Sequence, residues 1–132
     1  MRILVCGLPG SGKTTLAEEL HRLTKFPHIN ADKIRKEHND WDFSAEGRLR
    51  QAKRMRSIAD TFSNCIADFV APTEEIRKIF NANILVWLDT IKESRFKDTN
   101  KIFEPPHWCQ YQICSKDAKR WAKLIENHIN NV

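Results

Sequence analysis

The stretch GLPGSGKT at residues 7–14 constrains the fold of this chain more than any other feature. It matches the pattern G-x-x-x-x-G-K-[ST] without a gap, follows an apolar run at residues 3–6 and precedes a helix-period run at residues 14–23. At such a junction glycines let the backbone wrap around an anion, and its N–H groups point inward beside the positive end of the helix dipole. The pattern therefore predicts a phosphate-binding loop (P-loop) that binds a nucleoside triphosphate.

The chemistry of this loop assigns roles to its side chains. Lys13 is expected to reach the β- and γ-phosphates and to serve catalysis, and the Thr14 hydroxyl is expected to hold Mg²⁺. ATP and Mg²⁺ are therefore the expected cofactors. The predicted cofactor-binding residues are Gly7, Pro9, Gly10, Ser11, Gly12, Lys13, Thr14 and Thr15.

The rest of the chain alternates short apolar runs with helix-period segments. Strands are expected at residues 1–6, 26–30, 65–70, 84–88 and 110–113. Helices are expected at residues 14–23, 31–37 and 73–80, and after caps at Ser44 and Ser115; residues 91–95 start helically, and the polar residues 96–107 predict a mobile loop. Such alternation implies a parallel sheet with helices on both faces, and residues 1–132 hold no linker that would split one domain.

Composition limits the class of protein. The chain is 41% hydrophobic and 30% charged, as in a globular protein, and no apolar run approaches the ~18 residues of a membrane span. No room for a signal peptide precedes the first strand, so a cytoplasmic location is expected. Cys6, Cys65, Cys109 and Cys114 form no CxxC pair and predict reduced, mostly buried thiols. The net charge of +5 suits an anionic ligand, either a nucleotide or a nucleic acid.

Three aspartates stand at the ends of expected strands. Asp32 follows the second strand, where a carboxylate faces the ligand crevice of an open α/β sheet and could accept a hydroxyl proton or hold Mg²⁺ through water; an ordinary helix cap is the alternative. Asp68 ends the third strand and, with Thr14, is a predicted metal-binding residue. Asp89 is expected to be a cap or a local structural residue.

Four segments resemble the adenylylsulfate (APS) kinase family. They are residues 7–15, NADKIR at 30–35, FSAEGR at 43–48 and DFVAP at 68–72, in the order in which that family has its P-loop, DGDNIR, FSxxDR and F-[IV]-S-P. The resemblance covers residues 1 to about 106. It implies a P-loop kinase-like, three-layer α/β/α fold with a five-stranded parallel sheet of order 2-3-1-4-5. It further implies transfer of the ATP γ-phosphoryl group to the 3′-hydroxyl of APS, a step of sulfate assimilation.

The resemblance also implies an acceptor site. Asp32 would be the catalytic or Mg²⁺-linked carboxylate, and two arginines would bind the phosphosulfate or its ribose. Aromatic rings would stack on the acceptor adenine, and a lid-like segment around residues 96–107 would bring a lysine to the phosphates on closure. The substrate-binding residues so implied are Asp32, Arg35, Phe43, Arg48, Phe69, Lys101 and Phe103.

Simpler interpretations of these residues stay open. Phe43 could be a hydrophobic staple before the helix capped by Ser44. Arg35 could be a solvated helix residue, and the 96–107 segment a plain surface loop. The five histidines show no catalytic or metal-binding pattern, and packing is the expected role of Trp41 and Trp108.

Departures from the family pattern leave the acceptor open. The chain has Asn30 and Gln51 where that family has Asp and Asn, and its lid is short and lacks a glycine. The alternatives are a kinase for another hydroxyl acceptor, such as a polynucleotide 5′-hydroxyl or a small metabolite, and a catalytically impaired nucleotide-binding module. Nucleic acid is not favoured, because no basic stripe interleaved with aromatic residues is evident. The expected partners are ATP and a small nucleotide-like acceptor, with no membrane; a homodimer is left open.

Overall fold

A computed structural model describes residues 1–131 of the chain. Its centre is a five-stranded sheet, parallel throughout, in the order β2-β3-β1-β4-β5. The strands are β1 (Arg2–Cys6), β2 (His28–Asn30), β3 (Cys65–Asp68), β4 (Ile84–Leu88) and β5 (Tyr111–Ile113). The predicted fold class and strand order are confirmed.

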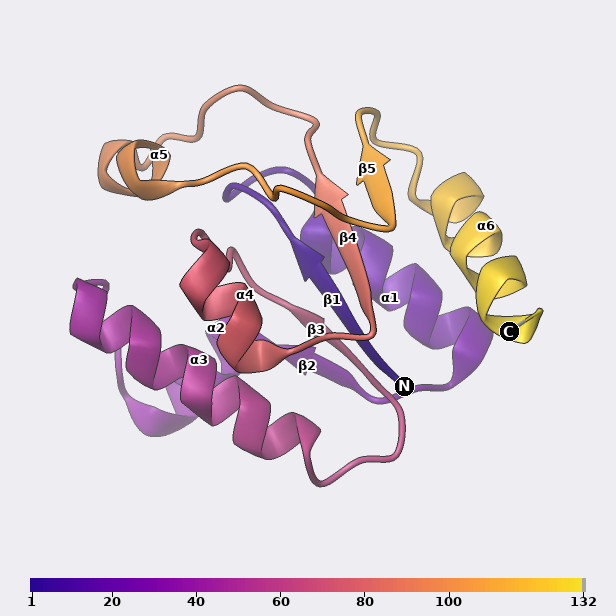
Figure 1. The fold of residues 1–132 in the computed structure, drawn as a ribbon, viewed down its shortest axis with the longest axis horizontal. Helices are drawn as coiled ribbons and strands as arrows, with labels where there is room; N and C mark the ends of the chain where they lie inside the picture. The colour runs from indigo at the N-terminus through magenta and orange to yellow at the C-terminus, as the bar shows by residue number, and fades with distance from the viewer. Residues whose placement is uncertain (132) are drawn as a thin grey trace.

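Helices cover both faces of the sheet and make three layers (Figure 1). They are α1 (Lys13–Thr24), α2 (Ala31–His38), α3 (Ala45–Ala59), α4 (Glu74–Phe80), α5 (Lys97–Ile102) and α6 (Ala118–Asn130). One apolar cluster joins α3 and α4 to the sheet through Met55 and Phe80, and a second joins α1 and α6 through Leu20 and Ile125. Among residues 1–131, no helix has both the length and the apolar character that crossing a membrane requires.

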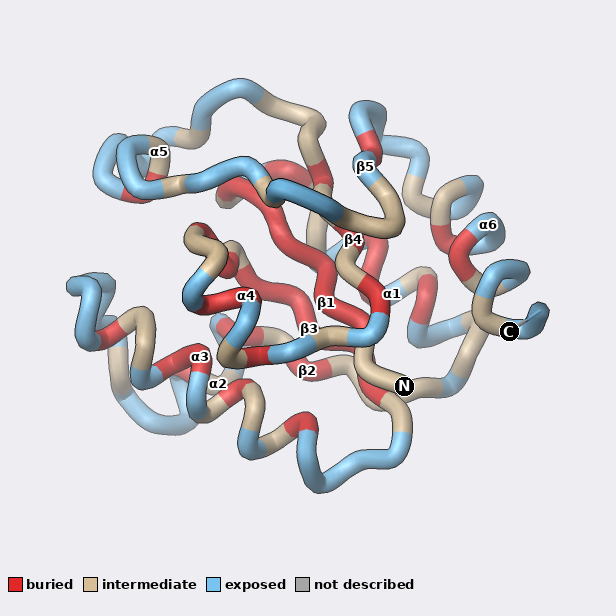
Figure 2. The backbone as a smooth tube through the Cα atoms, in the orientation of Figure 1, coloured by how far each residue is buried: buried red, intermediate tan, exposed pale blue. Residues whose placement is uncertain are grey.

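The central strand β1 shows why the sheet is buried on both sides. Ile3 and Val5 belong to the cluster under α1 and α6, and Leu4 and Cys6 belong to the cluster under α3 and α4. All four side chains are fully buried, which is typical of a strand inside a parallel sheet. Figure 2 shows the buried residues concentrated along the central strands, whereas the segment that contains α5 is mostly exposed.

Helix caps explain where two helices begin. The Ser44 hydroxyl accepts a hydrogen bond from the Gly47 backbone N–H at 3.2 Å, which confirms the predicted cap of α3. Asn30 caps α2 by accepting from the Lys33 backbone N–H at 3.0 Å, so the interpretation of Asp32 as the cap is wrong. The cap predicted at Ser115 is also wrong.

The start of α6 lies further along the chain than the sequence indicates. This helix begins at Ala118 after Asp117, without a side-chain cap. Ser115 instead accepts a hydrogen bond from the Trp121 indole N–H, at 3.0 Å through its carbonyl oxygen and 3.3 Å through its hydroxyl. The serine is therefore tied to the first turns of the helix without opening it.

The segment at residues 91–107 differs most from its prediction. Residues 91–95 form no helix, and residues 97–102, expected in a loop, form α5. The Asn100 side chain explains the helix: its amide donates to the Ser94 carbonyl at 2.8 Å, and its oxygen accepts from the Ser94 backbone N–H, also at 2.8 Å. These reciprocal bonds close a compact turn, and the periodicity of hydrophobic residues does not predict such bonds.

Residues 103–107 are fastened to α4. Arg77 is buried, and its guanidinium donates to the Ala71 carbonyl at 2.9 Å, to the Glu74 carboxylate at 2.9 Å and to the Glu104 carbonyl. It also lies 5.4 Å from the centre of the Phe103 ring. The Glu104 backbone N–H donates to Pro72 at 2.7 Å. This part of the predicted loop is therefore held by defined contacts.

Two of the four cysteines fit the expectation of buried thiols. Cys6 and Cys65 are buried, Cys109 is half-buried and Cys114 is exposed, and all four are free thiols. Burial raises the pKa of the Cys6 thiol to about 12, so it stays protonated at neutral pH.

Candidate active site

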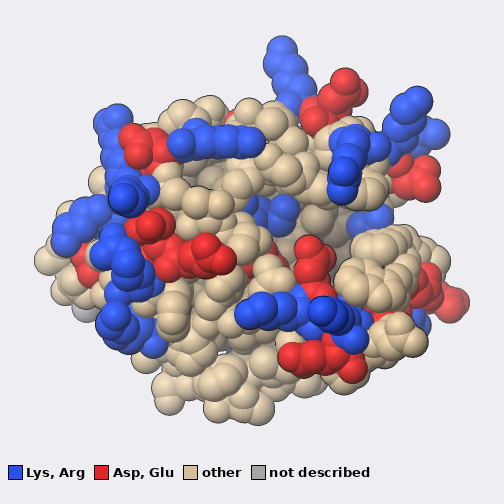
Figure 3. Space-filling model, turned by 180° about the vertical axis from the view of Figure 1, so that it is seen from behind, with Lys and Arg blue, Asp and Glu red and all other residues tan. Residues whose placement is uncertain are grey.

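A pocket of about 1530 Å³ lies at the carboxyl ends of the strands. In Figure 1 the strand arrows point toward the side of the molecule where α5 lies. Figure 3 shows the hollow from behind, with Lys and Arg atoms inside it and basic and acidic side chains interspersed around it. The pocket is lined by residues 9–16 of the P-loop and α1, by Ala31, Asp32 and Arg35 of α2, by Trp41 and Phe43, by Arg48 and Gln51 of α3, by residues 68–72 and 76, by residues 88, 90, 91 and 93–99, and by residues 115–118 and 121.

Three glycines shape the P-loop. Gly10 and Gly12 adopt φ angles of 85° and 101°, which L side chains rarely tolerate. Gly7 stands behind the loop, where a Cβ atom would lie 2.7 Å from the Leu88 carbonyl oxygen. The Ser11 hydroxyl is buried and has no hydrogen-bond partner among residues 1–131. Apart from Gly7, every predicted cofactor-binding residue lines the pocket.

Lys13 lies at the base of the loop. Its Nζ donates to the Leu8 carbonyl oxygen at 3.0 Å. Burial lowers the pKa of this ammonium group, and the negative charges of Asp68 and Asp32 act in the opposite direction by favouring its charged form. A half-buried cation near two carboxylates, at the start of a helix, is suited to a polyanion such as a triphosphate.

The two predicted metal-binding side chains lie side by side. Asp68 pairs with Val5 of β1 in the sheet, and the Thr14 hydroxyl donates to the Asp68 carboxylate at 3.3 Å. Mg²⁺ prefers oxygen donors and usually takes one or two from the protein, with water and phosphate oxygens completing the shell. The Thr14 and Asp68 oxygens fit that chemistry. Within residues 1–131, no group of three or more His, Cys, Asp or Glu could hold a metal by itself.

Sequence reasoning missed two neighbours of Asp68. The His28 imidazole Nε2 contacts one carboxylate oxygen of Asp68, and the Asn30 amide donates to the same carboxylate at 3.1 Å and to the Thr14 hydroxyl at 3.3 Å. Both residues belong to β2, which pairs with β3 so that Asn30 lies opposite Asp68. The signal that could have found them is the pairing of β2 with β3, which the strand order 2-3-1-4-5 already implies.

Asp32 lies in the first turn of α2, exposed and facing the pocket. It shares this wall of the pocket with Arg35, one turn further along the same helix. The arrangement brings an ionisable carboxylate and the P-loop to one cavity. A carboxylate at this edge can accept a proton from a bound hydroxyl group.

Two arginines and a phenylalanine form a stacked group in the pocket wall. The Arg35 guanidinium lies 4.3 Å and that of Arg48 lies 5.5 Å from the centre of the Phe43 ring. Arg48 also donates to the Phe43 carbonyl at 2.8 Å and to the Thr99 hydroxyl at 3.0 Å. Burial lowers the pKa of both guanidinium groups, which nevertheless stay charged because arginine starts so high.

These contacts decide between earlier interpretations. Arg35 is buried and lines the pocket, so it is not a solvated helix residue. Phe43 is 51% exposed, and the residue four positions after the Ser44 cap is Arg48, so its neighbour is a guanidinium group rather than the apolar partner of a hydrophobic staple. Trp41, for which packing was expected, is also 51% exposed and lines the pocket.

The remaining predicted acceptor residues divide into two sets. Phe69 is buried and lines the pocket. Lys101 and Phe103 are not among the pocket-lining residues, and Phe103 contacts Arg77 instead. The pocket wall near α5 is built by residues 93–99, which include Phe96 and Lys97. The structure therefore does not bring Lys101 and Phe103 together with the other acceptor residues.

Side chains that follow β4 and β5 donate hydrogen bonds to backbone carbonyls of the P-loop. The Thr90 hydroxyl donates to the Ser11 carbonyl at 2.7 Å, and Lys116 Nζ donates to the Gly10 carbonyl at 2.8 Å. Trp121 of α6 lines the same part of the pocket. Asp89 is a local structural residue, as predicted: its carboxylate accepts from the Gln112 amide at 3.0 Å. The sequence carries no local motif for Thr90 or Lys116.

Comparisons with known proteins place the chain in a family. It belongs to the family described as AAA domain, whose model matches residues 3–112. No protein of curated function matches the sequence. An APS kinase of Mycobacterium tuberculosis, in complex with AMPPNP and APS, is similar in structure with a TM-score of 0.82, 16% identity, and coverage of 98% of this chain and 96% of that one.

Kinases for other acceptors are similar as well. Shikimate kinase from Acinetobacter baumannii, in complex with shikimate, gives a TM-score of 0.73 at 19% identity over 98% of this chain and 93% of that one. A gluconokinase from Sinorhizobium meliloti 1021 gives 0.66 at 15% identity over 98% and 96%. The chain thus has the fold of P-loop small-molecule kinases. The resemblance stated from the sequence is confirmed at that level, and the acceptor is a separate question.

Proposed function

We propose that this protein is a Mg²⁺-ATP-dependent kinase that transfers the γ-phosphoryl group to the 3′-hydroxyl of APS. The observation that carries the proposal is the meeting of two sets of residues in one pocket. Lys13, Thr14 and Asp68 supply phosphate and metal chemistry, and Arg35 and Phe43 lie across the same cavity. An arginine and an aromatic ring in a pocket wall are suited to bind a nucleotide acceptor that carries an anionic group.

Phosphoryl transfer requires positioning and charge stabilisation more than covalent participation by the protein. The P-loop N–H groups and Lys13 bind the phosphates and offset the charge that develops on them. Mg²⁺, when bound at Thr14 and Asp68, supplies Lewis-acid stabilisation of the phosphate oxygens. Asp32 accepts the proton of the acceptor hydroxyl as that oxygen attacks.

The acceptor assignment rests on chemical fit and on the resemblance. Arg35 and Arg48 offer charged donors to the phosphosulfate or ribose of APS, and Phe43 and Phe69 offer apolar surface to its adenine. One structurally similar kinase binds both AMPPNP and APS, and others act on acceptors without a base. The aromatic residues of this pocket favour an acceptor that carries a base.

Product analysis tests the proposal directly. Protein, Mg²⁺-ATP and APS are mixed, with ATP alone and a 5′-hydroxyl oligonucleotide in parallel reactions. A 3′-phospho-APS product with stoichiometric ADP is expected. ADP formation without phosphorylated APS would contradict the APS assignment and direct attention to other acceptors, with a phosphorylated oligonucleotide identifying one of them.

The substitution Asp32→Asn separates an enzyme from a nucleotide-binding module. Removal of a general base lowers turnover roughly a hundredfold to ten-thousandfold, and ATP affinity is expected to stay nearly unchanged. Turnover is measured by ADP release and affinity by calorimetry. Unchanged turnover in the variant would reject the role of Asp32, and absence of turnover in the unmodified protein with ATP still bound would favour a binding module.

A further inference from the structure

The loop between α2 and α3, residues 39–44, presents two aromatic side chains to the pocket. Trp41 and Phe43 each have 51% of their surface exposed, and both line the cavity. Exposed aromatic rings on a loop contribute to binding only if the loop is held in place, because ordering the loop otherwise consumes binding free energy. The contacts of this loop with its neighbours therefore bear on acceptor binding.

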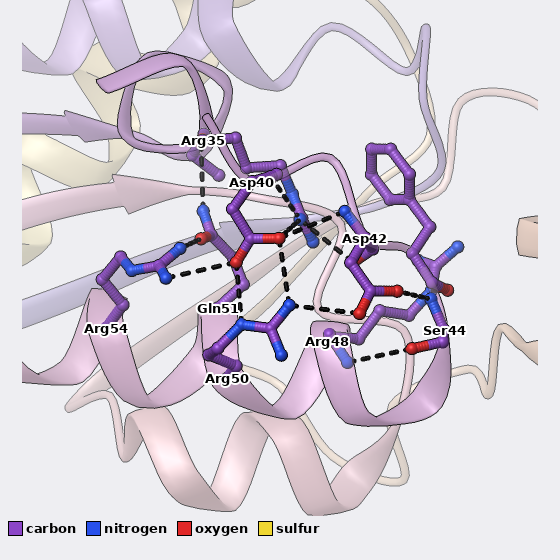
Figure 4. Close-up of polar contacts among 11 residues, drawn as sticks. Arg35, Asp40, Asp42, Ser44, Arg48, Arg50, Gln51 and Arg54 are labelled. Atoms are coloured by element: carbon purple, nitrogen blue, oxygen red, sulfur yellow. Dashed lines mark hydrogen bonds and ion pairs between the residues drawn. The ribbon is translucent and has the colours of Figure 1, made fainter. Parts of the chain in front are cut away.

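Asp40 anchors the loop to α3 (Figure 4). Its carboxylate accepts two hydrogen bonds from Arg50, at 2.8 and 3.0 Å, and one from Arg54 at 3.2 Å. Arg50 also donates to the Asp42 carboxylate at 3.1 Å. Trp41 stands between the two aspartates that Arg50 joins. The arginine hydrogen bonds hold the pKa of the Asp40 carboxyl well below its usual range, so this carboxylate is ionised at neutral pH.

The same loop holds Arg35 in the pocket wall. One guanidinium nitrogen of Arg35 donates to the backbone carbonyls of Asp40, at 3.0 Å, and Asp42, at 3.2 Å. The Asp40 carboxylate lies 4.0 Å from this nitrogen. The position of the Arg35 charge therefore depends on the path of the loop backbone.

Gly47 shows how closely the loop lies against the helix. A Cβ atom at this position would be 2.1 Å from the Asp42 carbonyl oxygen and 2.5 Å from the Asp42 carboxyl carbon. No other residue type leaves room for the backbone to cross the first turn of α3 here. The close approach and the ion pairs fix the same stretch of chain independently of each other.

We propose that Asp40 is a positioning residue, whose contacts with Arg50 and Arg54 hold Trp41 and Arg35 in place to bind the acceptor. This proposal rests on the proposed kinase function. Asp40 touches neither the pocket nor the reacting atoms, since it is not among the lining residues. Its effect on the reaction is therefore transmitted through the loop and through Arg35.

The substitution Asp40→Asn, which keeps the shape and removes the charge, tests the proposal. We expect the KM for APS to rise roughly tenfold to a hundredfold, the loss that follows a displacement of about 1 Å at a binding site, with the KM for ATP unchanged. Asp60→Asn is the matched control, because Asp60 also joins two arginines, Arg2 and Arg56, outside the pocket. Equal KM values for APS in the two variants would overturn the proposal.

Hydrogen exchange of the ligand-free protein gives a readout that needs no acceptor. The Asp42 amide donates to the Asp40 carboxylate at 3.2 Å, so amide exchange over residues 40–43 is expected to accelerate in Asp40→Asn and not in Asp60→Asn. Unchanged exchange in this segment would overturn the positioning role even if kinetics changed. If the unmodified protein does not phosphorylate APS, the proposed function fails, and this measurement still decides how the loop is held.

A second variant tests the proposal in case Asp40→Asn does not fold. Arg50→Gln removes the guanidinium group that binds the Asp40 carboxylate and leaves Asp40 with its hydrogen bond from Arg54. If Asp40→Asn fails to fold, as judged by circular dichroism, the same rise in KM and the same local increase in exchange are expected from Arg50→Gln. A folded Arg50→Gln protein with the kinetics of the unmodified protein would overturn the proposal.

Discussion

The two halves of the pocket are built by different means. The half proposed to bind phosphate (the phosphate half) is built around one continuous segment, residues 9–16, whose backbone curves at glycines with positive φ and leads directly into α1. The acceptor half is assembled from side chains of α2, the 39–44 loop, α3, the end of β3 and the α5 segment. The first half is lined by the P-loop, and the second is lined by arginines and aromatic rings.

This difference separates what is general from what is specific in such a fold. Main-chain N–H groups bind phosphate in any nucleotide, so the phosphate half is expected to tolerate different acceptors. Side chains can be exchanged one at a time, so the acceptor half can change its ligand without disturbing the fold. An APS kinase, a shikimate kinase and a gluconokinase share this fold.

The largest effect is expected at the phosphate half. Lys13→Ala removes the half-buried cation of the P-loop, and we expect turnover to fall roughly a hundredfold to a thousandfold, as when one preorganised donor to developing charge is lost. ATP affinity should fall as well, whatever the acceptor. Lys123→Ala, an exposed lysine on α6 paired with Glu126, is the control. If both variants lose equally little activity, the phosphate half is not where the triphosphate binds.

An intermediate effect, confined to one substrate, is expected at the acceptor half. Arg48→Gln removes a charged donor, whose hydrogen bonds are worth about 1.5–3 kcal/mol, so the KM for the acceptor should rise by about a factor of ten or more. ATP affinity, measured by calorimetry, should not change. Arg22→Gln on α1 is the control, since Arg22 is exposed, pairs with Glu19 and does not line the pocket. Parallel loss of ATP affinity in Arg48→Gln would contradict the division of the pocket.

The smallest effect is on stability, and its sign is opposite to the usual effect of replacing a helical glycine by alanine. Glycine to alanine inside a helix normally stabilises a protein by about 0.5–1 kcal/mol. At Gly47 the added Cβ would collide with the Asp42 carbonyl, and overpacking of this kind costs about 1–3 kcal/mol. Gly47→Ala is therefore expected to lower the free energy of unfolding in urea, whereas Ser57→Ala, at an exposed site on the same helix, should leave it nearly unchanged. A stabilised Gly47→Ala protein would show that the loop is not held against α3.

The same contrast explains how much the sequence could predict. The P-loop and the parallel sheet were predicted correctly, because a local motif and alternating periodicity encode them, and the strand order was predicted correctly from the family resemblance. Asp68 was correctly placed at the end of β3. His28 was missed, since its link to Asp68 depends on the pairing of β2 with β3, forty residues apart in the chain.

The acceptor half was predicted only in part, for reasons of the same kind. Arg35, Phe43 and Arg48 line the pocket, and the family pattern is what singles them out in the sequence. The sequence predicts a packing role for Trp41. Its exposure depends on the path of the 39–44 loop, which contacts of Asp40, Arg50 and Gly47 determine together and which no local pattern encodes. The helix α5 depends on the reciprocal bonds between Ser94 and Asn100, which no propensity registers.

The buried Arg77 has a practical consequence for redesign. From α4 it donates one hydrogen bond to the Glu104 carbonyl and two to residues of α4 and the segment before it, so a change of chain length at residues 103–107 would break this anchor. On the other side of α5, Ser94 is held by hydrogen bonds with Asn100. A designer who wished to lengthen this segment would insert residues between Ile91 and Glu93 and leave the stretch after Phe103 untouched.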